Sequence, residues 1–115
     1  MTYKTSVKIR LHLNDKVALG PGKADLLEAI KQHGSISAAG RAMNMSYKRA
    51  WDLVNIMNES FAKPIVLTVK GGSHGGGAEV TELGKQVLAQ YRQAQLQAEK
   101  AIEHEMLSLS HQLTD

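Results

Sequence analysis

Apolar and polar residues alternate strictly in the segment VKIRLHL, at residues 7–13. Its two sides carry different residues: Val7, Ile9, Leu11 and Leu13 on one, and Lys8, Arg10 and His12 on the other. A period of two residues predicts a half-buried strand. Asn14 and Asp15 follow as a turn, so we expect a short return strand over residues 16–19.

Apolar positions with a helical period follow in two short segments. Gly-Pro-Gly at residues 20–22 breaks the strand pattern and predicts a first helix over residues 23–33, ended by Gly34. Ser35 is a good N-cap for a second helix, because its hydroxyl can accept a bond from a free backbone N–H. We expect the inner face of this second helix to hold four residues: Ile36, Ala39, Ala42 and Met43.

A third helical pattern begins after a very short link. Asn44 tolerates the left-handed backbone that ends a helix, and Ser46 can cap a third helix over residues 47–61. Its two faces separate cleanly, with Ala50, Leu53, Val54, Met57 and Phe61 inside and Lys48, Asp52, Asn55 and Glu59 outside. Two helices joined by a link of about three residues form the helix-turn-helix layout.

The rest of the chain predicts a hairpin and one long helix. Apolar residues 65–69 and residues 78–80 flank a glycine-rich loop, KGGSHGGG, and predict a two-stranded wing. Thr81 can cap a final helix that reaches residue 110 or so, about 45 Å at 1.5 Å per residue.

The apolar side of this final helix is too long for a small body to cover. Pairing with a second copy would bury it, so we expect a homodimer formed through six positions: Leu83, Val87, Tyr91, Ala94, Ala98 and Ile102. The alternative is a distal half that frays or binds another protein. The predicted fold class is α+β, a winged helix-turn-helix over residues 1–80 with an N-terminal strand or hairpin, a three-helix core and a two-stranded wing, followed by a long C-terminal dimerisation helix over residues 81–115.

Composition and charge narrow the chemistry. The 115 residues include no cysteine, which excludes disulfides, thiol nucleophiles and cysteine-ligated zinc. The net charge is +3, and residues 1–80 hold eleven Lys and Arg against six Asp and Glu. A polyanion is therefore expected to dock on this part of the chain.

The outer face of the third helix supplies the groups that read base edges in the major groove of duplex DNA. The candidate DNA contacts on and near it are Ser35, Ser46, Tyr47, Lys48, Arg49, Asp52 and Asn55. A solvated face with helix-stabilising charge pairs is the alternative for the charged residues. For Trp51, on the flank of this helix, we favour packing over a direct DNA contact.

The glycine-rich loop is the second candidate contact. It lacks the GK[ST] ending of a phosphate-binding P-loop and lies between strands, so we expect a wing tip that approaches the DNA backbone. The contacts would come from Lys70, Gly71, Gly72, Ser73 and His74. Two alternatives are a mobile turn without a ligand and oxyanion binding by the glycines.

Other functions receive little support. The five histidines show no metal-ligand spacing, no Ser/His/Asp constellation is visible, and we expect neither a cofactor nor an enzyme. There is no apolar run long enough to span a membrane and no signal peptide pattern, so we expect a cytoplasmic protein.

Two segments carry a family resemblance: GSISAAGRAMNMSYKRAWDLVNIMN at residues 34–58 and VKGGSHGGGAEVTELGKQVL at residues 69–88. Together they closely resemble the N-terminal DNA-binding domain of the molybdate-responsive ModE regulators, which is related to the LysR-type winged helix. The resemblance implies dimerisation through the terminal helix and DNA reading by the helix that opens at Ser46, Tyr47, Lys48 and Arg49.

ModE regulators sense molybdate through C-terminal oxyanion-binding domains, and the sequence ends at Asp115 before any such domain. We therefore expect a stand-alone DNA-binding version of the family that does not bind molybdate directly. The rival hypothesis is a winged helix that binds a protein partner and has little affinity for DNA. A steep loss of affinity with salt would favour DNA, because counterions are released when phosphates are bound.

Overall fold

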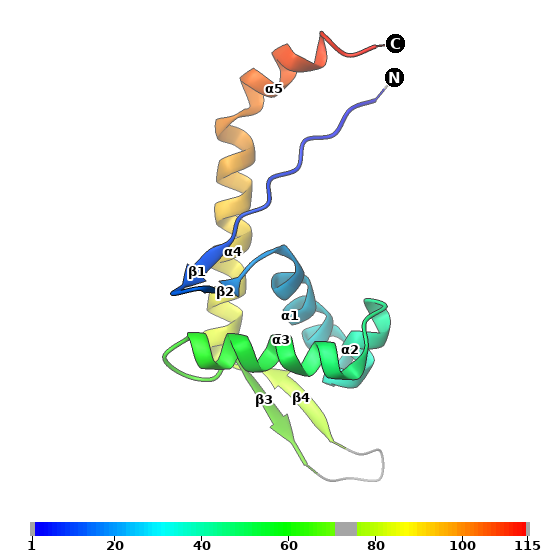
Figure 1. The fold of residues 1–115 in the computed structure, drawn as a ribbon, viewed down its shortest axis with the longest axis vertical. Coiled ribbons are helices and arrows are strands. Elements are labelled where there is room, and N and C mark those ends of the chain that lie inside the picture. Colours follow the sequence, from blue (N-terminus) through cyan, green and yellow to red (C-terminus); the bar gives the residue numbers. More distant parts are fainter. Residues whose placement is uncertain (1, 71–75, 115) are drawn as a thin grey trace.

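The computed structural model describes residues 2–70 and 76–114. Its elements run in the order β1 (Leu11–Leu13), β2 (Lys16–Leu19), α1 (Pro21–His33), α2 (Ile36–Ala42), α3 (Tyr47–Ser60), β3 (Val66–Val69), β4 (Gly77–Val80), α4 (Glu82–Ala101) and α5 (Glu103–Ser110). Figure 1 shows α3 lying across the body, with the β3–β4 hairpin projecting on one side and α4 rising on the other. The predicted winged helix-turn-helix fold is confirmed.

The helix boundaries follow the predicted capping residues. Gly34 has a φ of 76° and ends α1 in the left-handed conformation, where a side chain would be strained. Ser35 and Ser46 cap α2 and α3, each accepting a bond from the backbone N–H three residues later, at 3.0 Å in both cases. Asn44, with a φ of 56°, turns the chain between the two helices.

The three helices enclose the core through large apolar and small side chains. The largest fully buried side chains are those of Leu26, Leu27, Ile30, Val54, Met57 and Ile65. One predicted inner residue is wrong, because Ala42 is exposed and Gly40 is buried in its place. A Cβ on Gly40 would lie 3.2 Å from the Cβ of Ala50, so α2 and α3 approach closely at this point.

The predicted N-terminal strand is shorter than its alternating pattern. Only Leu11–Leu13 pairs with β2, and Leu11 and Leu13 are exposed rather than buried. The return strand is four residues long and offers no partner for residues 7–10. Those residues extend along α4, where the Tyr91 hydroxyl donates to the Ile9 carbonyl oxygen at 2.7 Å.

The wing is an antiparallel pair, with Val66 opposite Val80 and Val69 opposite Gly77. It is attached to the helices at both strands. The Asn58 carboxamide, on α3, bonds the backbone of Ile65 and Val66, and the Ala78 N–H donates to the Gly34 carbonyl oxygen at 2.8 Å. The wing is therefore held in a defined position relative to α3.

The first half of α4 belongs to the core, where Gly84, Val87, Leu88 and Tyr91 are buried. Thr81 caps the helix by accepting from the Gly84 N–H at 3.1 Å, and its hydroxyl donates to the Pro64 carbonyl oxygen at 2.8 Å. The predicted single helix to about residue 110 is wrong. Ile102 leaves the helical conformation, with a ψ of 6°, and α5 turns away (Figure 1).

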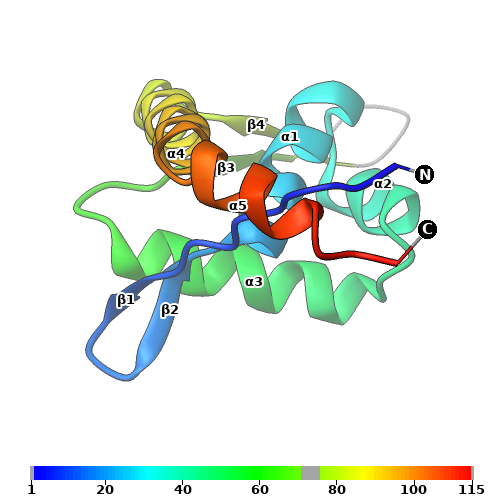
Figure 2. The same cartoon turned by 90° about the horizontal axis from the view of Figure 1, so that it is seen from above.

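The end of α4 reaches beyond the core in Figure 1, and Figure 2 shows the same helix nearly end-on. Without a core beside it, local preference decides where the helix breaks, and a β-branched Ile is a weak helix former. The radius of gyration is 17.0 Å, against about 13 Å expected for a compact chain of this length. The overhang therefore dominates the 56 Å length of the molecule.

Candidate nucleic-acid interface

The outer face of α3 is exposed to solvent among the described residues. Asn55, Glu59, Lys48 and Asp52 are exposed, and Lys48 retains 85% of its side-chain exposure. The opposite side of the same helix buries Ala50, Leu53, Val54 and Met57. A helix with its side chains is about 10–12 Å across, close to the width of the major groove of duplex DNA.

Lys48 and Asp52 form an ion pair at 3.0 Å, one helical turn apart. This pair is the helix-stabilising arrangement that we kept as the alternative for this face. Because both side chains remain exposed, the pair is weak and can open when a base or phosphate is offered. The base contacts predicted for Lys48 and Asp52 stay predictions.

The first turn of α3 exposes polar groups beside this face. The Ser46 oxygen accepts from the Arg49 N–H, which leaves its own hydroxyl hydrogen available to a phosphate oxygen. Arg49 is exposed on the side of α3 away from Tyr47 and Trp51. The N-terminal end of a helix also favours anions, because its backbone N–H groups point outward.

A groove separates the start of α3 from the wing. Its volume is about 270 Å³, and its walls come from three elements: Ser35, Ile36 and Ser37 of α2 and its cap, Tyr47 and Trp51 of α3, and Thr68, Val69, Lys70, Gly76 and Gly77 of the wing. The structure thus brings Ser35 and Tyr47, predicted with the third helix, together with Lys70, predicted with the wing. The predicted contacts Gly71, Gly72, Ser73 and His74 lie outside the described residues.

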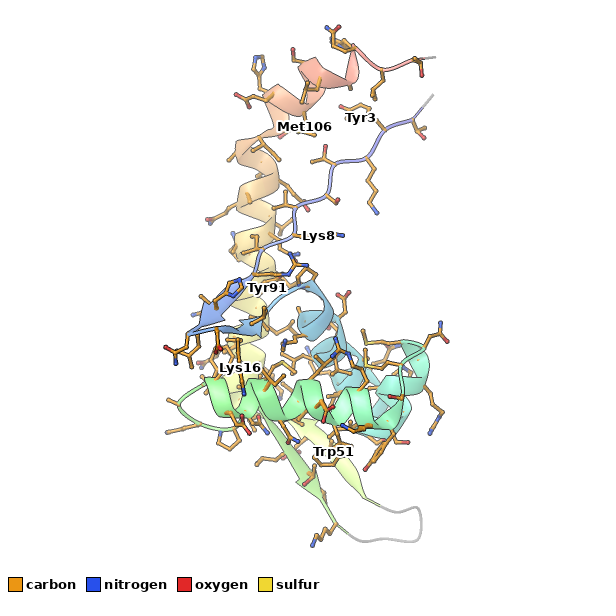
Figure 3. All side chains as sticks on the ribbon, viewed as in Figure 1. Tyr3, Lys8, Lys16, Trp51, Tyr91 and Met106 are labelled. Atoms are coloured by element: carbon orange, nitrogen blue, oxygen red, sulfur yellow. The ribbon has the colours of Figure 1, made fainter. Side chains whose placement is uncertain are left out.

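The two aromatic residues of the groove differ in exposure. Tyr47 is 58% exposed, whereas Trp51 is half-buried and packs against the core. Their rings meet edge to face, with centroids 6.1 Å apart. Figure 3 shows Trp51 on the wing side of α3. Trp51 therefore packs as expected, and whether it also contacts DNA stays untested, since it lines the groove beside the Tyr47 ring.

Sequence reasoning missed two polar residues of this groove. Ser37, in the first turn of α2, accepts a bond from Arg41 at 2.8 Å, and a serine beside a capping serine is a signal that could have been used. Thr68 faces the groove only because the wing packs against the end of α1, and no local pattern predicts that contact.

The predicted dimerisation positions fall into two groups. Val87 and Tyr91 are less than 10% exposed within a single copy, because they pack into the core, so little of either side chain is left for a partner. Burial also raises the pKa of the Tyr91 hydroxyl. Leu83, Ala94, Ala98 and Ile102 keep partial or full exposure. Their role in a dimer stays a prediction.

Within residues 2–70 and 76–114, no three His, Asp or Glu side chains gather in a way that could hold a metal ion. In the same part of the chain no helix combines the length and apolar character needed to cross a bilayer.

Relatives match between about two thirds and three quarters of the chain. The molybdenum transport protein ModE of Azotobacter vinelandii is 38% identical over 86 residues, which are 75% of this chain and 32% of that protein. The DNA-binding transcriptional dual regulator ModE of Escherichia coli is 35% identical over 88 residues, 76% of the chain and 34% of the relative. The molybdenum-pterin-binding protein MopB of Rhodobacter capsulatus is 47% identical over 73 residues, 64% of the chain and 27% of the relative.

The chain therefore spans about a third of the length of the relatives it matches. No protein family model matches it. Among solved structures, the full-length LysR-type regulator LysG of Corynebacterium glutamicum aligns with a TM-score of 0.55 at 20% identity, covering 83% of this chain and 30% of that one. That likeness confirms the fold. The sequence matches show that the chain is similar to the N-terminal region of ModE-type transcriptional regulators, and the likeness to LysG adds the fold alone.

Proposed function

We propose that this chain is a DNA-binding transcriptional regulator that reads duplex DNA with the outer face of α3. The observation that carries the proposal is the polar outer face of α3, lying next to a groove lined by the wing. The relatives named as transcriptional regulators support the same function. No catalytic role is assigned.

The outer face of α3 and the groove would have different roles, because they carry different chemical groups. Asn55 can bond adenine, and Lys48 can bond guanine or a phosphate, which makes the outer face suitable for reading sequence. The hydroxyl groups of the groove and the exposed Lys70 suit phosphate oxygens, which position a protein without reading sequence. A cytoplasmic location, which the sequence pattern led us to expect, is consistent with this proposal, since the DNA would lie there.

The regulator would act as a homodimer through α4 and α5. Leu96, Leu107 and Leu109 are each about half exposed on the part of the chain that overhangs the core. Pairing of two overhangs would cover these side chains and place two copies of α3 on one DNA molecule. We keep residues 1–80 as the DNA-binding unit and residues 81–115 as the dimerisation segment.

The test is selection of bound duplexes from a random DNA pool, followed by anisotropy titrations of the enriched duplex at two salt concentrations. We expect an enriched inverted repeat whose affinity falls steeply with salt, because bound phosphates release counterions. An absence of enrichment at low salt would overturn the proposal and favour the protein-interaction module. The exposed leucines of the overhang are the observation in favour of that second candidate.

A further inference from the structure

Four cationic side chains surround a hollow on the other flank of α3. Its volume is about 430 Å³, and it lies between the N-terminal segment, β2, the start of α1, and α3. The cations lining it are Lys8, Arg10, Lys23 and Arg49, and the remaining walls are Val17, Pro21, Gly22 and Leu53. These cations come from three segments that are far apart in the sequence, so only the fold gathers them.

Three acidic side chains of α1 and α3 pair with cations outside the hollow. Asp25 and Glu28, on α1, pair with Arg92 of α4 at 2.8 and 3.7 Å. Asp52 pairs with Lys48 on the outer face of α3. In the part of the chain that the structure describes, none of the four cations of the hollow has an acidic partner within 4.0 Å.

The charges of the cluster also act on one another. Burial lowers the pKa of the Lys23 ammonium group, and the positive charge of Arg49 lowers it further. An anion placed between these two groups would favour the charged form of Lys23 and remove the repulsion.

The start of α1 adds neutral donors to the same hollow. Gly20 precedes the helix in an extended conformation, and no side chain caps the first turn. The backbone N–H groups of Gly22 and Lys23 therefore have no partner within the helix. A Cβ on Gly22 would meet nothing within 4 Å, so the approach to this backbone is open.

The hollow and the wing groove lie on opposite flanks of the reading face. At about 100° per residue, Arg49 and Leu53 are roughly 160–240° around α3 from Tyr47 and Trp51, with Lys48 and Asn55 between the two pairs. Figures 1 and 2 likewise place the β1–β2 hairpin and the wing on opposite sides of α3. A helix in the major groove has one sugar-phosphate strand on each flank.

We propose that the hollow formed by Lys8, Arg10, Lys23 and Arg49 binds a phosphate group of the DNA strand that borders α3 on the side away from the wing. The inference rests on the proposed function and extends it. The wing would contact one strand and the hollow the other, so that α3 is held in the groove from both sides. Free phosphate is the other source of the same chemistry.

The test compares four proteins on the selected duplex and on an unrelated one: the wild-type chain, Lys23→Gln, Arg10→Gln and the control Lys100→Ala. Lys100 lies in the last turn of α4 and does not line the hollow, and its variant loses the same charge. We expect Lys23→Gln and Arg10→Gln each to reduce the slope of log affinity against log salt by about one unit, on both duplexes. Lys100→Ala should keep the wild-type slope.

Two other outcomes would overturn the inference, and they are distinguishable from failure of the proposed function. If the wild-type chain binds DNA but the two variants keep its slope, the hollow does not hold a backbone phosphate. If, in addition, inorganic phosphate alone shifts the amide resonances of Gly22 and Lys23, the hollow is a free-oxyanion site. If the wild-type chain binds neither duplex at low salt, the proposed function fails and this inference fails with it.

Discussion

Two asparagines of α3 lie three residues apart and have different roles. Asn58 is half-buried, and its carboxamide oxygen accepts from the Ile65 and Val66 N–H groups at 2.8 and 3.1 Å, while its nitrogen donates to the Val66 carbonyl at 3.0 Å. Asn55 is exposed on the outer face. Asn58 attaches the wing to α3, and Asn55 is exposed to a ligand.

Replacing Asn58 by alanine should therefore damage folding. Two N–H groups at the start of the wing would lose their acceptor, so we expect Asn58→Ala to lower the free energy of unfolding by about 2–3 kcal/mol. Urea denaturation measures this. An unchanged midpoint would show that the three bonds do not hold the wing in solution.

Replacing Asn55 by alanine should spare folding and weaken DNA binding. An exposed position contributes little to stability, within about 0.5 kcal/mol. If Asn55 contacts a base, anisotropy titration of Asn55→Ala on the selected duplex should show a loss of about 1–3 kcal/mol. An equal loss on unrelated duplexes would contradict a base contact.

The local sequence pattern predicts the structural roles of some residues well and those of others poorly. Ser46 and Gly34 were predictable as caps because their roles depend on their immediate neighbours in the chain. Asn58 was not, since its partners come from a strand whose position is set by the whole fold. Lys8, Arg10 and Lys23 were visible as charges, but only packing brings them around one hollow with Arg49.

At the scale of elements, α4 lies very close to the start of the wing. A Cβ on Gly84 would clash with the Ile65 carbonyl oxygen and lie 2.6 Å from Val80 Cγ1. We expect Gly84→Ala to destabilise the protein by about 1–3 kcal/mol, because the helix would have to move. Thermal unfolding followed by circular dichroism measures the effect.

Gly22→Ala is the matched control for this substitution. Gly22 is also in the first turns of a helix, but a Cβ there has open space. We expect its stability to stay the same or rise by up to about 1 kcal/mol. If both alanine variants unfolded at the same temperature, close packing of α4 on the wing would be disproved.

Helix periodicity predicted α1, α2 and α3 to within a few residues, because each has one face that the core requires. The same reasoning failed where no core is present. The alternating N-terminal segment pairs over three residues only, and α4 ends at Ala101. Beyond the core, apolar spacing no longer determines which residues are buried.

At the scale of the whole molecule, the overhang of α4 and α5 exposes apolar side chains that a partner would cover. If a second copy covers it, the wild-type chain should sediment with twice the mass of one chain. Leu96→Glu should shift the equilibrium toward a single copy, because a charge would be buried at the interface. Leu67 of the wing is similarly exposed, and Leu67→Glu should leave the mass unchanged.

If Leu96→Glu sediments as a dimer to the same extent as the wild-type chain, the interface lies elsewhere. The sequence suggested this overhang through its long apolar stripe, but it did not separate the residues that pack within one copy from those left outside. Val87 and Tyr91 are on the stripe and are buried in a single chain, because they pack into its core.

The central claim is that the outer face of α3, flanked by the wing, binds duplex DNA. Nuclear magnetic resonance titration of the full chain with the selected duplex tests it most directly, since the backbone amide of each residue other than proline gives its own signal. The account predicts the largest shifts at residues 46–55 and in the wing strands beside the groove. Shifts confined to α4 and α5, with α3 unperturbed, would contradict it.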